Sequence, residues 1–302
     1  MTVKLAAQIG AWYYVRPLNR VFSEISDLGF DGVELLETSL ELYGVTVEQT
    51  LSLAKSHSLQ IASLYANIDL ASQPKTVNRR FNEAATAAKN LCCKKLIIGS
   101  PYNPNNKAMT QSLSKSCENL QGIGTLSKEI DIEVAVHPHH RTPIQSRESI
   151  DTFLEKTNPS EIGLCIDSGH LFLGDVDVKT LLEQHGDRIN HIHLKDAKFG
   201  PVSRQDKARI RKNFLKLDSI LDMTEAIRPV ASRLIKSRSF DFVPLGEGTS
   251  KWTQIVEFVL QSGYKNWITF EVDQPELLAR QSLEISRDAY LQMCRNLIDK
   301  HT

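Results

Sequence analysis

Short apolar runs rich in β-branched residues alternate along the chain with longer segments in which apolar residues recur at helical spacing. This alternation is typical of repeated strand–helix units that build a parallel sheet. Helices are predicted at 18–28, before the helix-stop residue Gly29, at 74–91, opening with Pro74, and at 276–299. The eight predicted strands cover residues 5–11, 32–36, 60–65, 95–99, 132–136, 162–166, 189–194 and 267–272.

Eight units without a break in composition predict a closed barrel rather than an open sheet. The chain has 302 residues, a length that suits such a barrel, for which about 250 residues or more is typical. No glycine-rich phosphate-binding fingerprint follows the first strand, which counts against a dinucleotide-binding fold. The predicted fold is therefore α/β, a (β/α)8 TIM barrel that forms a single domain over residues 1–302.

One connection is much longer than the others. More than fifty residues separate the seventh strand from Lys251, whereas loops in such units commonly have about 2 to 6. Residues 195–238 hold twelve lysines and arginines against five acidic residues. This insertion, about 197–245, is predicted either as a solvated basic excursion or as a lid that contacts an anionic ligand. Apolar residues at helical spacing within it predict a helix on the barrel mouth: Ile210, Phe214, Leu217 and Leu221.

Composition and charge narrow the class of protein. The hydrophobic fraction of 41% and the charged fraction of 24% are close to those of soluble globular proteins. Lysine plus arginine equals aspartate plus glutamate at 36 each, so no net field favours nucleic acid or an anionic membrane. No stretch approaches the ~20 apolar residues that span a bilayer, and the N-terminus predicts a strand rather than a signal peptide. The five cysteines lack metal-type spacing and are expected to be reduced thiols in a cytoplasmic protein.

Histidine and carboxylate side chains gather where four predicted strands end. The fifth strand ends in V-A-V-H-P-H-H, the sixth in C-I-D-S-G-H, the seventh in H-I-H-L-K-D and the eighth in F-E-V-D. In a barrel of this kind, functional side chains lie at the C-terminal ends of the strands. Imidazole and carboxylate from separate strands are ligands for a divalent ion such as Mn2+, Co2+, Zn2+ or Fe2+. One such histidine alone is more often a hydrogen-bonded core residue, but four strand ends together favour a metal site.

The same segments carry a family resemblance. D-S-G-H-L-F-L-G-D, R-I-N-H-I-H-L-K-D, G-E-G and G-Y-K-N-W-I-T-F-E-V-D resemble the xylose isomerase-like sugar phosphate isomerase/epimerase superfamily. H-P-H-H-R-T-P-I-Q-S-R-E-S-I-D-T-F-L-E is similar to the inosose dehydratase branch of that superfamily. The resemblance covers most of the chain from about residue 130 onward, and the first half matches only in its strand rhythm and in G-F-D-G-V-E-L-L.

The resemblance implies one divalent ion, with Mn2+ or Co2+ favoured over Zn2+, Fe2+ or Mg2+. Its implied ligands are His137, Asp167, His193 and Glu271. His137 stands where the family usually has a glutamate. His139 is an alternative ligand, but His137 is preferred because it continues the period-two alternation of Glu133 and Ala135.

A divalent ion bound to a ketone and a neighbouring hydroxyl stabilises the enediolate that forms when the α-proton is lost. A base within hydrogen-bond reach must take that proton. The candidate bases are His170, Lys195 and, third, His139. The candidate substrate contacts are Glu34, Trp12 and His191. Three of these residues also have a purely structural interpretation. Lys195 could form a salt bridge, Glu34 an ion pair at the barrel rim, and Trp12 could simply pack in the core.

Four functions compete. The first is a lyase that dehydrates a cyclic polyol ketone such as an inosose, and the second is an isomerase or epimerase of a keto-sugar or its phosphate. The family's epimerases place two metal-bound glutamates on opposite sides of the reacting carbon, so His137 favours dehydration.

A third function, a metal-dependent endonuclease, is disfavoured because the third and fourth strands end in S-L-Y-A-N and I-I-G-S-P, without histidine. The fourth is a non-catalytic sugar-binding or regulatory barrel. The expected partners are a small polyol or sugar and further copies of the chain in a homo-oligomer.

Overall fold

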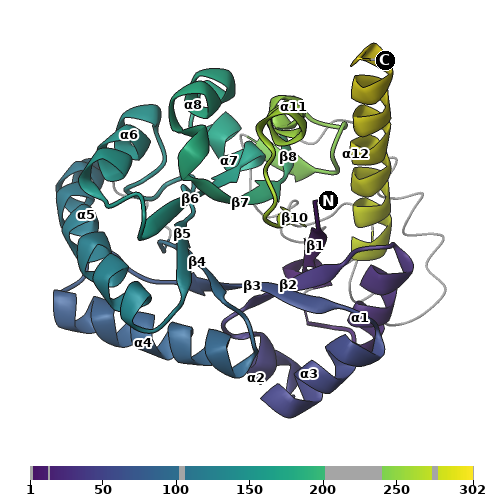
Figure 1. Cartoon of the computed structure of the whole chain (residues 1–302), viewed down its shortest axis with the longest axis horizontal. Helices are drawn as coiled ribbons and strands as arrows, with labels where there is room; N and C mark the ends of the chain where they lie inside the picture. The colour runs from purple at the N-terminus through teal and green to yellow at the C-terminus, as the bar shows by residue number, and fades with distance from the viewer. Residues whose placement is uncertain (1–2, 13, 102–105, 201–239, 274–277, 302) are drawn as a thin grey trace.

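The structure is a computed structural model that describes residues 3–12, 14–101, 106–200, 240–273 and 278–301. Eight parallel strands form a closed barrel in the order β1-β10-β7-β6-β5-β4-β3-β2 (Figure 1). This arrangement confirms the predicted TIM barrel. The barrel strands are β1 (Leu5–Gln8), β2 (Gly32–Leu36), β3 (Gln60–Asn67), β4 (Lys95–Gly99), β5 (Glu133–Val136), β6 (Ile162–Asp167), β7 (Ile189–Leu194) and β10 (Ile268–Phe270).

Helices surround the barrel (Figure 1). Several have clear local start and stop signals: Pro74 opens α4, and Gly263, with φ of 71°, follows α11. Fully buried side chains such as Phe22, Phe81 and Phe153 belong to the apolar core that these helices share with the strands. The helices are α1 (Leu18–Asp27), α2 (Ser39–Tyr43), α3 (Val47–Ser56), α4 (Pro74–Asn90), α5 (Asn106–Glu129), α6 (Arg147–Lys156), α7 (Ser168–Leu173), α8 (Val178–His185), α11 (Trp252–Ser262) and α12 (Ala279–His301), with short 3-10 turns η1 (Ile9–Trp12) and η2 (Gly186–Arg188).

The first strand is shorter than the sequence predicts. It ends at Gln8, and the residues that the apolar run assigned to the strand's end form the η1 turn instead. Trp12, at the end of this turn, is fully buried, and its indole N–H donates to Glu24 Oε2 of α1 at 2.8 Å. Ile9, Ala11 and Trp12 are buried in this turn, and a short apolar run does not by itself distinguish a strand from such a turn.

Alternate residues of β5 face the barrel interior and form layers along its axis. Glu133, at the start of the strand, forms an ion pair with Lys95 of β4. Ala135 packs with Cys165 of β6 in a small apolar cluster at the next level. His137 follows in the same alternation, just beyond the strand's C-terminal end. The alternation along β5 therefore places His137 at the C-terminal end of the barrel, where functional side chains lie in this fold.

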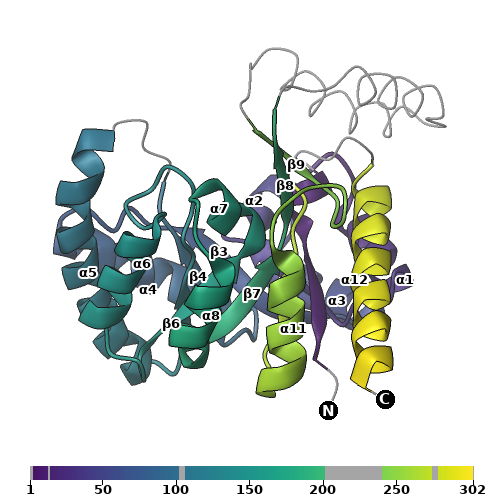
Figure 2. The ribbon, with the colours of Figure 1, turned by 90° about the horizontal axis from the view of Figure 1, so that it is seen from above.

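The long insertion begins directly after β7 with a strand that the sequence did not predict. In this two-stranded antiparallel ribbon, β8 (Asp196–Phe199) pairs with β9 (Phe240–Val243). The ribbon rises from the end of the barrel opposite the two chain termini (Figure 2). Asp196 fixes the base of the ribbon to the segment that follows β9. Its carboxylate accepts hydrogen bonds from the backbone N–H groups of Gly246, Gly248 and Ser250, each at 3.0 Å. The expected lid and its helix at 210–221 lie outside the described residues.

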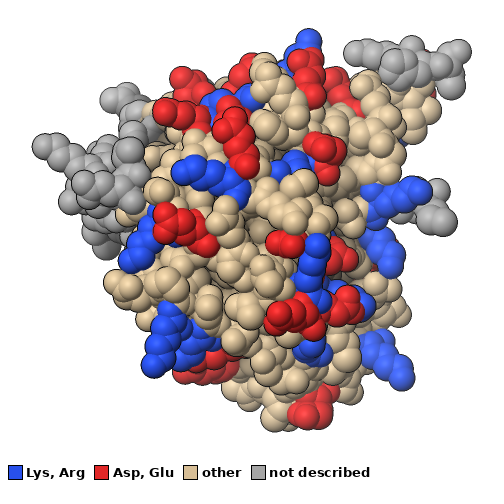
Figure 3. All heavy atoms as spheres, turned by 60° about the vertical axis from the view of Figure 1, so that its left-hand side comes forward, with Lys and Arg blue, Asp and Glu red and all other residues tan. Residues whose placement is uncertain are grey.

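The surface carries charges of both signs. On the face shown in Figure 3, lysine and arginine side chains alternate with aspartate and glutamate side chains. This mixture agrees with the equal totals of basic and acidic residues in the sequence. Among the described residues, no helix has the length and apolar character that crossing a bilayer requires.

Candidate metal centre

Four side chains from separate strands converge at the C-terminal end of the barrel. One ligand atom from each of His137, Asp167, His193 and Glu271 lies within 4.8 Å of the others. Sheet register brings them together: Asp167 of β6 pairs with His193 of β7, and the Glu271 N–H donates to Leu194 O at 3.1 Å. All four are buried, with exposed fractions of 3%, 0%, 0% and 8%. The four ligands expected from the sequence therefore form one cluster.

The facing atoms of this cluster suit a divalent cation. His137 Nε2 lies 3.3 Å from Asp167 Oδ2, and His193 Nδ1 lies 2.9 Å from Glu271 Oε2. The second pair is close but not aligned for a hydrogen bond, so both atoms are buried without a hydrogen-bond partner among the described residues. Buried polar atoms without partners are costly. Two imidazole nitrogens and two carboxylate oxygens are a ligand set for a borderline divalent ion, which would satisfy both atoms.

Asp167 uses its two oxygens differently. Oδ1 accepts the His170 backbone N–H at 2.9 Å and caps the first turn of α7. Oδ2 faces the cluster, 3.3 Å from His137 Nε2 and 3.5 Å from Lys195 Nζ. Burial by itself would raise the pKa of Asp167, but the positive charge of Lys195 leads the opposing effects, which hold the pKa well below its usual value. The carboxyl is therefore ionised and available to a cation.

Lys195 lies at the edge of the cluster among carboxylates. Its Nζ is 2.7 Å from Glu271 Oε1, 3.0 Å from Asp273 Oδ2 and 3.3 Å from His170 Nε2. Burial would lower the pKa of this amine, but the charges of Asp167, Asp273 and Glu271 outweigh it and hold the pKa well above its usual value. The salt bridge to Glu271 that the sequence left open is thus formed, and it places the amine beside the metal ligands.

The imidazole rings of His170 and His139 lie against each other, tilted by 38°, next to Lys195. Their ring centroids are 3.8 Å apart. Burial lowers the pKa of His139 to about 4, helped by the charges of His137 and Lys195, and burial also leads the effects that hold the pKa of His170 well below its usual value. Both rings are therefore neutral. The structure groups His137, rather than His139, with the other three metal-binding candidates.

The three expected substrate contacts have no open surface. Glu34 and His191 are fully buried inside the barrel, and the Glu34 carboxylate lies 3.0 Å from His193 Nε2, on the side of that ring away from the cluster. Burial would raise the pKa of Glu34, but His193 and His191 outweigh it and hold the pKa well below its usual value. Trp12 is fully buried against α1 through its bond to Glu24. All three side chains are enclosed in this structure, as are the metal-binding candidates Asp167 and His193, so their contact with substrate stays a prediction.

Tyr65, which the sequence analysis overlooked, also lies at the site. Its ring packs edge-on against His137, with centroids 5.5 Å apart. A Cβ added at Gly99 would collide with the Tyr65 hydroxyl, so this glycine makes room for the phenol. The available signal was the alternation along β3, which places Tyr65 on the same face as Ser63 and Asn67, together with a glycine, Gly99, that ends β4.

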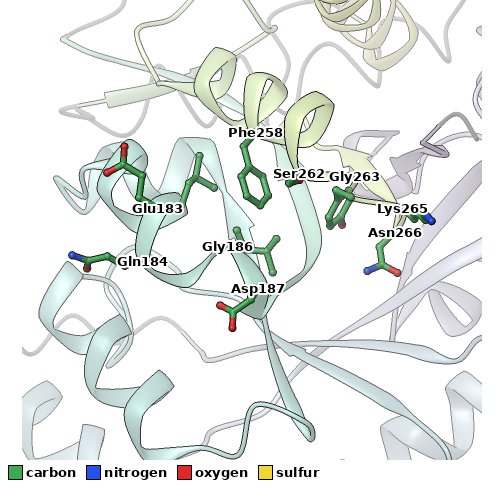
Figure 4. Close-up of a pocket in the computed structure, with 12 residues that line it drawn as sticks. Glu183, Gln184, Gly186, Asp187, Phe258, Ser262, Gly263, Lys265 and Asn266 are labelled. Atoms are coloured by element: carbon green, nitrogen blue, oxygen red, sulfur yellow. The ribbon is translucent and has the colours of Figure 1, made fainter.

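A separate hollow lies at the other end of the barrel. It has a volume of about 800 Å3 and is lined in part by Asp187, Phe258 and Tyr264 (Figure 4). Its lining residues come from the segments just before β7 and β10, at the N-terminal ends of these strands. It shares no residue with the metal-binding candidates.

Comparison with known sequences finds one family and a set of enzymes. A family model described as xylose isomerase-like TIM barrel matches residues 22–289. An inosose dehydratase of Bacillus velezensis is 28% identical over 165 residues, covering 54% of this chain and 48% of that protein. An inosose dehydratase of Lactiplantibacillus plantarum is 26% identical over 183 residues, covering 61% of this chain and 54% of that protein. The chain thus spans about half the length of the curated relatives it matches.

Solved structures share the whole fold. The IOLI protein, whose crystal structure has a bound zinc atom, has a TM-score of 0.72 at 14% identity, covering 96% of this chain and 98% of that one. A D-allulose 3-epimerase from Methylomonas sp. has a TM-score of 0.69 at 15% identity, with the same coverage of 96% and 98%. At these identities the likeness shows the fold.

Proposed function

This chain belongs to the xylose isomerase-like TIM barrel family, and on that premise we propose that it is a divalent-metal-dependent lyase that removes water from a cyclic polyol ketone. The two curated inosose dehydratases compared above support the substrate class, since they match this chain at 28% and 26% identity. The metal would be held by His137, Asp167, His193 and Glu271. Mn2+ or Co2+ is the preferred ion, and Zn2+, Fe2+ and Mg2+ also suit ligands of this kind.

The observation that carries the choice of reaction is the imidazole at residue 137. Epimerisation next to a ketone needs one base on each face of the carbon, and the family's epimerases use metal-bound glutamates from strands five and eight. In this chain only Glu271 occupies such a position among the described residues of the cluster. A histidine bound to the ion through Nε2 has only Nδ1 left, which faces away from the ion and is a poor base for a carbon there.

Elimination requires an acid and a base on the same side of the substrate, and the neighbouring Lys195 and His170 can supply them. A bound divalent ion would polarise the ketone and acidify the neighbouring C–H bond. One of the two nitrogens accepts the α-proton and the other protonates the departing hydroxyl, which leaves as water. Lys195 Nζ and His170 Nε2 are 3.3 Å apart, so a proton can pass between them and restore the pair. His139, whose ring lies against that of His170, is the third candidate for this chemistry.

The second candidate function is isomerisation or epimerisation of a keto-sugar or its phosphate. The specific observation in its favour is Glu271, which offers a carboxylate to the ion and lies 2.7 Å from the Lys195 amine. A D-allulose 3-epimerase with the same fold adds support for this class.

The test begins with elemental analysis of the purified protein. A screen of inososes and ketohexoses in D2O follows, read by ultraviolet absorbance and NMR. We expect one divalent ion per chain and an enone or diketone product from an inosose. A ketohexose converted to its C3 epimer, with deuterium at that carbon and no dehydrated product, would establish the epimerase instead. A protein that holds no ion after incubation with Mn2+ or Co2+ would refute both candidates.

A further inference from the structure

The strongest unexplained feature of the barrel interior is a carboxylate on the far side of a metal-binding candidate. Glu34 is fully buried, and its Oε2 lies 3.0 Å from Nε2 of His193. The other nitrogen of that ring, Nδ1, faces Glu271 Oε2 at 2.9 Å and Asp167 Oδ2 at 3.8 Å. We propose that Glu34 is a positioning residue that fixes the tautomer and the ring orientation of His193 for metal binding. This inference rests on the proposed metal centre.

The physical reason lies in the two nitrogens of a neutral imidazole. One nitrogen carries the proton and the other has the lone pair that binds metal. An ionised carboxylate can only accept, so Glu34 requires the proton of His193 to be on Nε2. Nδ1 then presents its lone pair to the cluster. Without Glu34, the ring could carry its proton on Nδ1, and that tautomer cannot bind the ion.

Glu34 is itself held rigidly by the strands on both sides of it. Sheet register pairs Gln8 of β1 and Ser63 of β3 with Glu34 of β2. Gln8 Nε2 donates to Glu34 Oε1 at 2.9 Å, and Ser63 Oγ donates to Glu34 Oε2 at 2.6 Å. Residues of three adjacent strands thus hold the Glu34 carboxylate in a position where it contacts His193 of β7, across the barrel. Partners of this kind typically change metal affinity by about 10- to 100-fold when removed.

A competing explanation is a second ion held by Glu34, His191 and His193, whose ligand atoms also lie within 4.8 Å of one another. The hydrogen bonds oppose it. Both Glu34 oxygens already accept from protein donors, and His191 Nε2 lies 3.0 Å from the hydroxyl of Thr269. An ion at this position would have to displace these bonds, whereas His193 Nδ1 and Glu271 Oε2 have no hydrogen-bond partner among the described residues.

The test measures Co2+ binding to the whole chain with Glu34→Gln, Glu34→Ala and Ser63→Ala, the last of which removes only a support of Glu34. Ser63→Ala removes one bond to Glu34 but leaves the contact with His193 intact. Affinity is measured by competition with a chelator, and the visible d–d spectrum at saturation reports ligand geometry. We expect Glu34→Ala to weaken binding about 10- to 100-fold and to shift the spectrum. Glu34→Gln should lie between it and wild type, and Ser63→Ala, which loosens Glu34 but keeps its carboxylate, should weaken binding less than Glu34→Ala.

Each outcome has a distinct meaning. Wild-type affinity and spectrum in folded Glu34→Gln, while His193→Ala loses the ion, would overturn the positioning role and leave the metal centre standing. Two ions per wild-type chain, with one lost in Glu34→Ala, would overturn it in favour of a second site. A wild-type chain that binds no Co2+ would refute the proposed function as well. Glu34→Gln has nearly the shape of the native side chain, so the test does not depend on whether Glu34→Ala folds.

Discussion

Replacing Asp167 by asparagine separates the two roles of this side chain. Oδ1 caps α7 through the His170 N–H, whereas Oδ2 faces the metal-binding cluster. Asparagine is about as good an N-cap as aspartate, so Asp167→Asn keeps the cap. Asp167→Ala loses it, which costs about 1 kcal/mol. Lys195 keeps Glu271 at 2.7 Å and Asp273 at 3.0 Å as counter-charges in both variants, so the fold should survive.

The expected magnitudes differ between the two variants in stability but not in metal binding. In excess chelator, the thermal midpoint of Asp167→Ala should fall about 2–4 °C below that of Asp167→Asn, from about 1 kcal/mol in a large domain. Both variants should lose an anionic metal ligand and bind the metal at least ~100-fold more weakly. This loss is at or beyond the upper end of that typical for removing a hydrogen-bond partner of a metal ligand. The assays are differential scanning fluorimetry and chelator competition, with turnover in parallel. Retention of one tightly bound ion by Asp167→Asn would refute the ligand assignment.

Three further changes test other parts of the structure. Lys195→Met should lower kcat by about 10²- to 10⁴-fold while the ion is retained, and a parallel loss of metal in elemental analysis would contradict the acid–base role. Trp12→Phe should destabilise the protein by about 1–3 kcal/mol by removing the donor to Glu24, with KM unchanged, whereas a raised KM would restore the substrate-wall interpretation. Gly99→Ala should lower stability by about 1–3 kcal/mol because its Cβ meets the Tyr65 hydroxyl, and an unchanged thermal midpoint would show that Tyr65 lies elsewhere.

The sequence predicts the barrel and most of its strands well because both depend on local periodicity, although β1 and β10 are shorter than predicted. The predicted strand 162–166 appears as Ile162–Asp167, and 189–194 appears as Ile189–Leu194. Each strand buries one face on helices and the other in the barrel, so its apolar run is unambiguous. The β8–β9 ribbon escaped prediction because pairing between strands about forty residues apart leaves no local signal.

The sequence by itself determined that histidines and carboxylates end four strands, and the tertiary structure decided which of them meet. Period-two alternation already favoured His137 over His139, because it follows the strand geometry of β5. It did not reveal that Glu34 lies against His193, since the two residues are separated by 159 positions and meet only when the barrel closes. Nor did it show that Trp12 is enclosed, because burial depends on how neighbouring helices pack. Local pattern fixes which face of a strand a side chain occupies, and only closure of the sheet fixes what lies across from it.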